Sequence, residues 1–272
     1  MMLNPERIVC LTTETTEVLY LLGQQARIAG ISGYTTRPAV ARREKPRVSA
    51  FTSANLNKIL ALKPDLVLTA TDLQADIAAA LIKAGIEVHA FNQRSINDIF
   101  RMIATLGALT ASTDNAAHLI AGLQQQIERS REMASHLSSK PAVYFEEWDK
   151  PMISGIAWVS ELIDIAGGID IFADLARHPA ARERVIANGA EVIQRNPDII
   201  IGSWCGKKFN PEQLMARQGW SEINAVRNGW VHEIKSADIL QPGPSVVTHG
   251  LRQMQDIIQR WHAARTFSKH WS

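Results

Sequence analysis

Short runs of aliphatic and β-branched residues alternate with helix-like patterns along the first half of the chain. The segment 14–25 (ETTEVLYLLGQQ) predicts a helix, with glutamates in its first turn and Gly23 placed to end it. An alternation of strands and helices is typical of an α/β fold with a mainly parallel sheet. The strand-like runs of this half are RIVCLTT (7–13), RIAGIS (27–32), PDLVLTA (64–70) and IEVHAF (86–91).

The second half of the chain repeats the pattern of the first half. Three pairs of segments match in the same order, with offsets of about 130 to 145 residues. An offset of this length is too long for a solenoid, whose units run ~20–50 residues. The repeat therefore predicts two lobes of similar build. The matching pairs are EVLYLLG (17–23) with ELIDIAGG (161–168), LALKPDLVLTATD (60–72) with IQRNPDIIIGSWC (193–205), and GIEVHAFNQRS (85–95) with NGWVHEIKSAD (228–238).

A polar segment that favours helix formation lies between the two halves. It runs from Ser112 to Lys140 and is not rich in glycine or serine, so a flexible linker is the weaker interpretation. We expect one long helix that joins the lobes. The predicted organisation is an N-terminal α/β lobe at 1–111, a spine helix at 112–140 and a C-terminal α/β lobe at 141–272, with a ligand cleft between the lobes.

Composition and charge exclude several classes of function. The formal net charge of +2 is too small to favour nucleic acid or an anionic membrane surface as a partner. The two cysteines, Cys10 and Cys205, lie far apart and lack neighbours at metal-ligand spacing, so neither a disulfide nor a metal site is expected. Walker A and GxGxxG patterns are absent, and the histidines are scattered. We expect a monomer without a cofactor of its own.

The N-terminal segment MMLNPERIVCLTT lacks the charged region and apolar stretch of an export signal. If the chain is complete, this pattern predicts a cytoplasmic protein. Export remains the alternative, because the resemblance described below implies a periplasmic or lipid-anchored protein.

Ligands of open parallel sheets bind beyond the carboxyl ends of the strands. Aromatic residues gather in the predicted post-strand segments, and flat organic ligands bind to aromatic faces with a few polar groups nearby. For the first lobe the candidate ligand contacts are Tyr34, Phe51 and Thr52. For the second lobe they are Glu147, Trp148, Trp204 and Asp238.

The stretch FEEWDKPMISGIAW (145–158) allows three interpretations: catalytic acids, a metal site or a pocket wall. We expect it to follow a strand and to form the wall. Glu146 and Glu147 are adjacent, and adjacent strand residues point to opposite faces. A glycosidase needs two carboxylates that face one another ~5–9.5 Å apart. We therefore predict no catalytic residues and no metal ligands, with a carboxylate-dependent hydrolase as the remaining enzymatic alternative.

The chain resembles the helical-backbone class of ABC-importer substrate-binding proteins over nearly its whole length. The segment PRVSAFTSANLNKILALKPDLVLT, the later AGIEV, the spine and the second-lobe PDIII carry this resemblance. Known ligands of the class are cobalamin, ferric siderophores and haem. The segments EEWDKPMISGIAWVSELIDIAGGIDIF, IGSWCGKKF and HEIKSADILQPGP are most similar to the cobalamin-binding members.

The resemblance implies a non-enzymatic protein for uptake of a metal complex, with cobalamin or a related corrinoid as the ligand. A ferric siderophore or haem is the alternative, for which Tyr34 is the best-placed axial ligand. The class also presents one carboxylate on each lobe to an ABC permease and ATPase complex. Asp76 and Glu212 occupy the matching places, although acids in the first turn of a helix are also favoured by the helix dipole alone.

Overall fold

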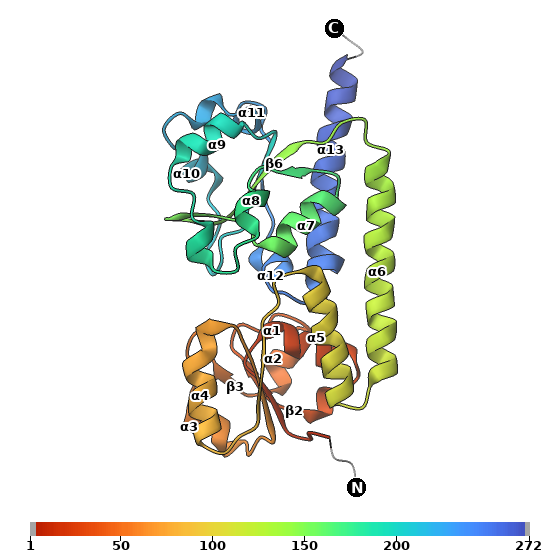
Figure 1. The fold of residues 1–272 in the computed structure, drawn as a ribbon, viewed down its shortest axis with the longest axis vertical. Helices are drawn as coiled ribbons and strands as arrows, with labels where there is room; N and C mark the ends of the chain where they lie inside the picture. Colours follow the sequence, from red (N-terminus) through yellow and green to blue (C-terminus); the bar gives the residue numbers. More distant parts are fainter. Residues whose placement is uncertain (1–3, 270–272) are drawn as a thin grey trace. The chain divides into compact units, whose positions relative to one another are not determined.

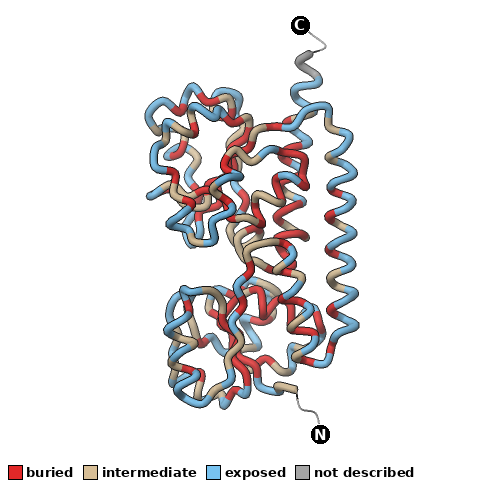
Figure 2. Tube along the Cα trace, in the orientation of Figure 1, coloured by how far each residue is buried: buried red, intermediate tan, exposed pale blue. Residues whose placement is uncertain are grey.

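The computed structural model describes residues 4–269, and the first three residues of the N-terminal segment discussed above lie outside this range. The chain forms two compact units. The N-unit runs to Leu123 and includes Pro242–Pro244, and the C-unit contains Gln124–Gln241 and Ser245 onward. Figure 1 shows the helices and strands of each unit, and Figure 2 shows that buried residues concentrate along the strands and on the inner helix faces.

The N-unit contains a five-stranded sheet in the order β3-β2-β1-β4-β5, in which every neighbouring pair is parallel. Strand β1 is central and buried on both faces, as its aliphatic run requires. Cys10 on this strand is fully buried, and burial raises the pKa of its thiol to about 12. The strands are β1 (Ile8–Cys10), β2 (Ile28–Ser32), β3 (Arg47–Ser49), β4 (Leu66–Ala70) and β5 (Val88–Phe91).

Helices of the N-unit follow the predicted alternation with the strands. Helix α1 ends two residues before Gly23, as the sequence predicts. Gly23 has a φ of +75°, a backbone conformation that glycine adopts at low cost. Helix α5 begins with a capping box in which Ser95 and Asp98 bond one another's backbone. The helices are α1 (Thr13–Leu21), η1 (Gln25–Arg27), α2 (Ala41–Glu44), α3 (Leu56–Ala61), η2 (Asp72–Gln74), α4 (Ala75–Lys83) and α5 (Ile96–Leu109).

The C-unit contains a second five-stranded sheet, in the order β10-β9-β6-β7 with β8 also paired to β6. Pairs β10–β9, β9–β6 and β6–β8 are parallel, and β6–β7 is an antiparallel hairpin. The sheet is therefore mainly parallel, as expected. The strands are β6 (Ala142–Asp149), β7 (Met152–Ser154), β8 (Ile169–Asp170), β9 (Ile199–Gly202) and β10 (Val231–Glu233).

Short helices surround the sheet of the C-unit, and one π-helical segment leads into the C-terminal helix α13. The apolar core on one side of this sheet collects Tyr144, Phe172, Trp204 and Trp220. The helices are α7 (Ala157–Ile165), α8 (Ala173–Ala176), η3 (Ala181–Arg184), α9 (Gly189–Arg195), α10 (Pro211–Met215), η4 (Trp220–Glu222), α11 (Asn224–Arg227), α12 (Ser236–Ile239), η5 (Val246–Leu251) and α13 (Arg252–Lys269).

The repeat seen in the sequence corresponds to matching positions in the two sheets. The Pro-Asp-aliphatic segments form β4 and β9, which lie parallel to β1 and β6 respectively. The Val-His segments form β5 and β10, where His89 pairs with Leu68 and His232 pairs with Ile201. The prediction of two α/β units with similar mainly parallel sheets is confirmed.

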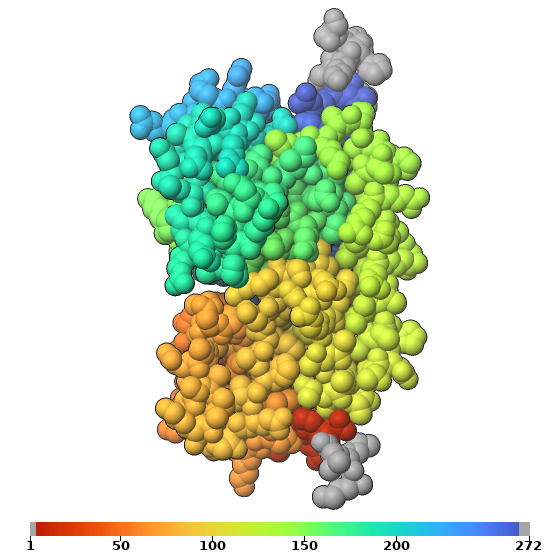
Figure 3. Space-filling model, in the orientation of Figure 1, coloured from red at the N-terminus to blue at the C-terminus, as the bar shows by residue number. Residues whose placement is uncertain are grey.

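Helix α6 (Thr113–Ser135) confirms the long helix expected in the segment 112–140 and ends five residues before Lys140. The division between the units falls within it, after Leu123. Leu123 and Ile127 are buried, whereas most of the helix lies on the surface, as Figure 3 shows. None of the helices in the described range has both the length and the apolar character that a membrane span needs.

The expectation that the FEEWDKPMISGIAW stretch follows a strand is wrong. Its first five residues are the last five residues of β6, and Met152–Ser154 return as β7. Phe145 and Trp148 favour a strand, and arginine partners balance the charges of Glu146 and Glu147, so β6 continues through these residues. A cis peptide bond before Pro151 lies in the turn. The stretch is therefore a hairpin at the carboxyl end of β6.

Candidate functional site

Large apolar side chains lie exposed at the carboxyl edge of the N-unit sheet. Tyr34 follows β2, Phe51 follows β3 and Leu73 follows β4, and their exposed fractions are 53%, 54% and 53%. Thr52 beside Phe51 is exposed as well. Such exposure opposes the tendency of large apolar groups to be buried, and a cluster of this kind marks an interaction surface. We call Tyr34, Phe51, Thr52 and Leu73 the N-edge surface.

The side chain of Gln74 fixes the backbone behind this surface. Its amide nitrogen donates to the carbonyl oxygens of Phe51 at 2.9 Å and of Leu11 at 3.2 Å, and its oxygen accepts from the Ala70 amide at 3.0 Å. Gln74 is 3% exposed. One buried amide thus joins the segments that follow β1, β3 and β4, and it holds Phe51 and Leu73 at the same edge. Neither Gln74 nor Leu73 is among the residues that the sequence pattern indicated as ligand contacts.

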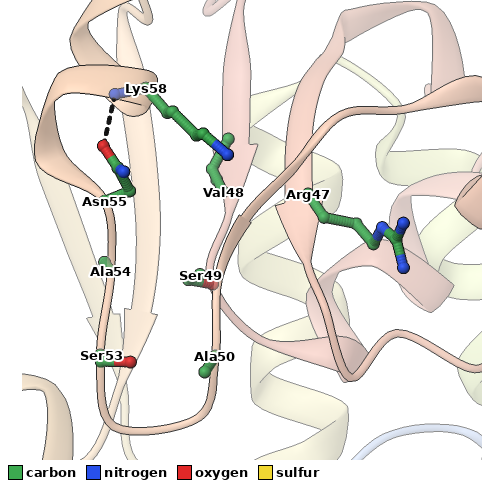
Figure 4. A pocket seen from close by; sticks show the side chains of 8 residues that line it. All are labelled: Arg47, Val48, Ser49, Ala50, Ser53, Ala54, Asn55 and Lys58. Atoms are coloured by element: carbon green, nitrogen blue, oxygen red, sulfur yellow. Dashed lines mark hydrogen bonds between the residues drawn. The ribbon is translucent and has the colours of Figure 1, made fainter.

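Phe51 and Thr52 lie at the tip of a short hairpin that extends β3. The Ala50 amide donates to the backbone carbonyl of Ser53 at 2.8 Å, and the Asn55 amide donates to the backbone carbonyl of Val48 at 2.9 Å. A hollow with a volume of about 380 Å³ lies beside this hairpin. Figure 4 shows its lining side chains, with the amine of Lys58 pointing toward Val48. Its lining residues are Arg47, Val48, Ser49, Ala50, Ser53, Ala54, Asn55 and Lys58.

In the C-unit, Glu146 lies on the core side of β6 and is fully buried. Arg217 holds it with two hydrogen bonds, one of 2.9 Å from Nη2 to Oε1. The Tyr144 hydroxyl and the Trp204 indole nitrogen each donate to it at 2.9 Å. Burial, followed by the charge of Glu146, raises the pKa of the Tyr144 phenol well above its ordinary value. Glu146 is thus a paired structural carboxylate.

Glu147 points to the opposite side of the strand, as the alternation predicts. It pairs with Arg184 through bonds of 2.7 and 3.2 Å, and Arg184 also donates to the carbonyl of Ser154. Arg184 is only 2% exposed. The two adjacent carboxylates therefore serve separate ion pairs on separate faces. They cannot act together as an acid and a base on one substrate.

Trp148 lies at the end of β6 and is half-buried. Its indole nitrogen donates to the carbonyl of Lys150 at 2.9 Å. The Lys207 ammonium lies 4.5 Å from the Trp148 ring centre and 4.7 Å from that of Trp204, within the range of a cation–π contact. Lys207 also pairs with Asp149, which accepts from Gln213 at 3.1 Å. We call Trp148, Asp149 and Lys207 the C-edge cluster.

Trp204 differs from Trp148 in its surroundings. It is 3% exposed and packs against Phe209 in the apolar core of the C-unit. Close packing is also evident at Gly202, where a Cβ would lie 1.9 Å from the Phe209 ring. Trp204 therefore supports Trp148 through Lys207 and offers almost no surface of its own.

Asp238 lies in α12 and is half-buried. Its carboxylate accepts from the amide nitrogen of Gln253 at 3.0 Å. The acids expected to dock on a transporter, Asp76 and Glu212, are both exposed in the first turns of α4 and α10. These helices come after β4 and β9, so the two acids hold repeat-related places.

Within the described residues, no group of three or more histidine, cysteine, aspartate or glutamate side chains has the arrangement of a metal site. The geometry offers instead aromatic and apolar surface with a few paired charges. Such a surface can bind an organic ligand by stacking and shape.

The chain belongs to the periplasmic binding protein family, whose model matches residues 8–237. It is 26% identical over 266 residues to an uncharacterised ABC transporter substrate-binding lipoprotein, YvrC, of Bacillus subtilis, covering 94% of this chain and 80% of that protein. It is 26% identical over 249 residues to the vitamin B12-binding protein of Vibrio cholerae, covering 88% and 84%.

Solved structures share the fold of nearly the whole chain. The periplasmic haem-binding protein RhuT of Roseiflexus superposes with a TM-score of 0.78 at 20% sequence identity, covering 95% of this chain and 98% of that one. The resemblance to substrate-binding proteins of ABC importers is confirmed. At this level of identity, relatives of different ligand specificity are similarly close.

Proposed function

We propose that this substrate-binding protein of the ABC-importer type binds cobalamin or a related corrinoid. The observation that carries the proposal is the N-edge surface, where Tyr34, Phe51 and Leu73 are exposed together at the carboxyl edge of a parallel sheet. A flat macrocycle has apolar faces for such side chains and polar substituents for neighbouring hydroxyl and amide groups. The similarity to a vitamin B12-binding protein supports the same ligand.

In the C-unit, Trp148 is the stacking residue that we assign to the ligand. Asp238 and Glu147 add polar contacts at the same carboxyl edge. Because Glu147 is held by Arg184, it presents a paired carboxylate rather than a free acid. The protein would bind its ligand without chemical change, since neither Glu146 nor Glu147 is available as a catalytic group.

Haem is the second candidate ligand, and the specific observation in its favour is Tyr34. Its side chain is 53% exposed at the N-edge surface, where a phenol oxygen could approach a metal ion. A ferric siderophore has weaker support, because cationic residues at the N-unit edge are partly balanced by acids, such as Arg94 by Asp72 at 3.9 Å.

Ligand identity is tested by titrating the purified protein with cyanocobalamin, a ferric hydroxamate and haemin. We expect cyanocobalamin to quench the tryptophan emission in a saturable manner and to bind most tightly of the three. Trp148, at the proposed contact surface, is the expected reporter. Calorimetry with the same ligands excludes optical artefacts. Preferential binding of haemin or the hydroxamate would refute the corrinoid assignment, and a lack of response to all three would refute ligand binding of this kind.

We further propose that Asp76 and Glu212 dock the protein on its ABC permease and ATPase complex. The double variant Asp76→Ala/Glu212→Ala should reduce ligand-dependent ATPase stimulation by tenfold or more. Each substitution removes one charge contact with the permease, which weakens docking by ~1–2 kcal/mol. Ligand affinity should stay unchanged.

The control for docking is Asp114→Ala, which removes another exposed acid from the first turn of a helix. Its stimulation should match the unaltered protein. Equal ATPase stimulation by the double variant and this control would show that Asp76 and Glu212 only stabilise the N-termini of their helices.

A further inference from the structure

The C-edge cluster places a positive charge directly beside the stacking surface of the C-unit. Asp149 ends β6, and Lys207 lies in the loop that follows β9. These segments remain together because the Ser203 amide donates to the backbone carbonyl of Glu146 at 2.9 Å and the Cys205 amide donates to the backbone carbonyl of Glu147 at 3.2 Å. Lys207 is thus fixed at the carboxyl edge, where ligands of parallel sheets bind.

Three contacts hold the Lys207 ammonium in one place. It pairs with Asp149 and lies over the rings of Trp148 and Trp204 at 4.5 and 4.7 Å. The side chain is still 39% exposed, whereas that of Asp149 is only 2% exposed. The cation of this pair therefore faces solvent, and the anion faces the protein.

The two neighbouring glutamates of this edge are paired with arginines. Glu146 pairs with Arg217, and Glu147 pairs with Arg184. Although burial raises the pKa of Asp149, the hydrogen bond and charge of Lys207 outweigh it and lower that pKa, so the carboxylate stays ionised at neutral pH. Beyond these pairs, the edge carries the exposed cations Lys150 and Lys208.

We propose that the C-edge cluster makes binding selective for ligand charge, so that a flat ligand with an anionic substituent is favoured over the same ligand without one. This inference rests on the proposed function, because it requires a ligand that stacks on Trp148. The ammonium of Lys207 would attract a carboxylate or similar group at the rim of the ligand. Asp149 would set the strength of that attraction by partly neutralising the ammonium.

The test compares cyanocobalamin with its monocarboxylic acids, made by hydrolysing one peripheral amide. The flat body is the same, so the ratio of the two dissociation constants isolates the effect of charge. The separated isomers are measured with the unaltered protein, with Lys207→Met and with Asp149→Asn. Methionine keeps an apolar stem between the indoles, and asparagine keeps the shape of the aspartate.

The two variants should shift this ratio in opposite directions. For the isomer whose acid lies nearest Lys207, Lys207→Met should lower the preference for the acid roughly fivefold, the factor given by one charge ~8 Å away at a dielectric constant of ~40. Asp149→Asn should raise the preference by about the same factor, because the ammonium loses its counterion. Added salt should reduce both shifts.

Lys140→Met is the matched control. Lys140 is a half-exposed lysine that also pairs with an aspartate, Asp164 at 3.8 Å, but it precedes β6 and so lies at the opposite, amino edge of the sheet. For Lys140→Met, the ratio of the two dissociation constants should equal that of the unaltered protein. Normal binding with an unchanged ratio in both cluster variants for every isomer would overturn this inference alone. Failure of the unaltered protein to bind either form would overturn the proposed function and this inference together.

Discussion

The free energy of unfolding of the Arg217→Met variant is expected to be about 3–5 kcal/mol lower than that of the unaltered protein. Glu146 is fully buried, and Arg217 provides its only charged partner among the described residues. Without the guanidinium, an ionised carboxylate would remain in the core with two neutral donors, Tyr144 and Trp204. Urea unfolding followed by circular dichroism measures the loss.

The control is Arg227→Met, which removes an exposed arginine at the end of α11 and should change stability by less than ~0.5 kcal/mol. The double variant Glu146→Gln/Arg217→Met should recover part of the loss, because a neutral amide can still accept from the tyrosine and the indole. Equal stability of Arg217→Met and Arg227→Met would contradict a structural role for the buried pair.

The double variant Tyr34→Ala/Phe51→Ala is expected to bind the ligand about 100-fold more weakly, since an aromatic contact at the centre of a binding surface contributes ~1–2 kcal/mol. Both side chains are more than half exposed, so their removal should leave folding intact. Calorimetric titration measures the affinity, and the thermal midpoint should shift little.

Leu21→Ala/Ile82→Ala is the matched control for this surface. These two apolar residues are 53% and 61% exposed in the N-unit, but they lie in the last turns of α1 and α4, away from the carboxyl edge of the sheet. Their loss should not alter affinity. A similar loss of affinity in both double variants would indicate a nonspecific effect and would refute the N-edge surface as the ligand contact.

Much of the fold could be predicted because it depends on local pattern. The Pro-Asp-aliphatic runs became β4 and β9, since continuous apolar segments of this length are buried in parallel sheets. The second half of β6 was missed because its charged residues resemble a loop. Their partners, Arg184 and Arg217, lie 37 and 71 residues away, and no spacing in the sequence indicates such pairs.

The location of the candidate site after the strands could be predicted, but the exposure of each aromatic residue in it could not. Exposed Tyr34 and Phe51 follow strands, as the rule for parallel sheets suggests. Trp204 also follows a strand, but the chain turns back so that its ring enters the core, with its indole nitrogen bonded to Glu146. Whether a post-strand aromatic faces solvent or core depends on the packing of the next loop, here through Phe209.

The N-unit takes three of its residues, Pro242–Pro244, from near the end of the chain. Gly243 lies so close to Glu14 that a Cβ on it would be 2.8 Å from the Cβ of Glu14. Glu14 is 5% exposed, and burial raises the pKa of its carboxyl group. During synthesis on the ribosome, the start of α1 therefore stays uncovered until Pro242–Pro244 have emerged. The N-unit can assemble its sheet early, but it becomes complete only after the C-unit segment Gln124–Gln241 has been synthesised.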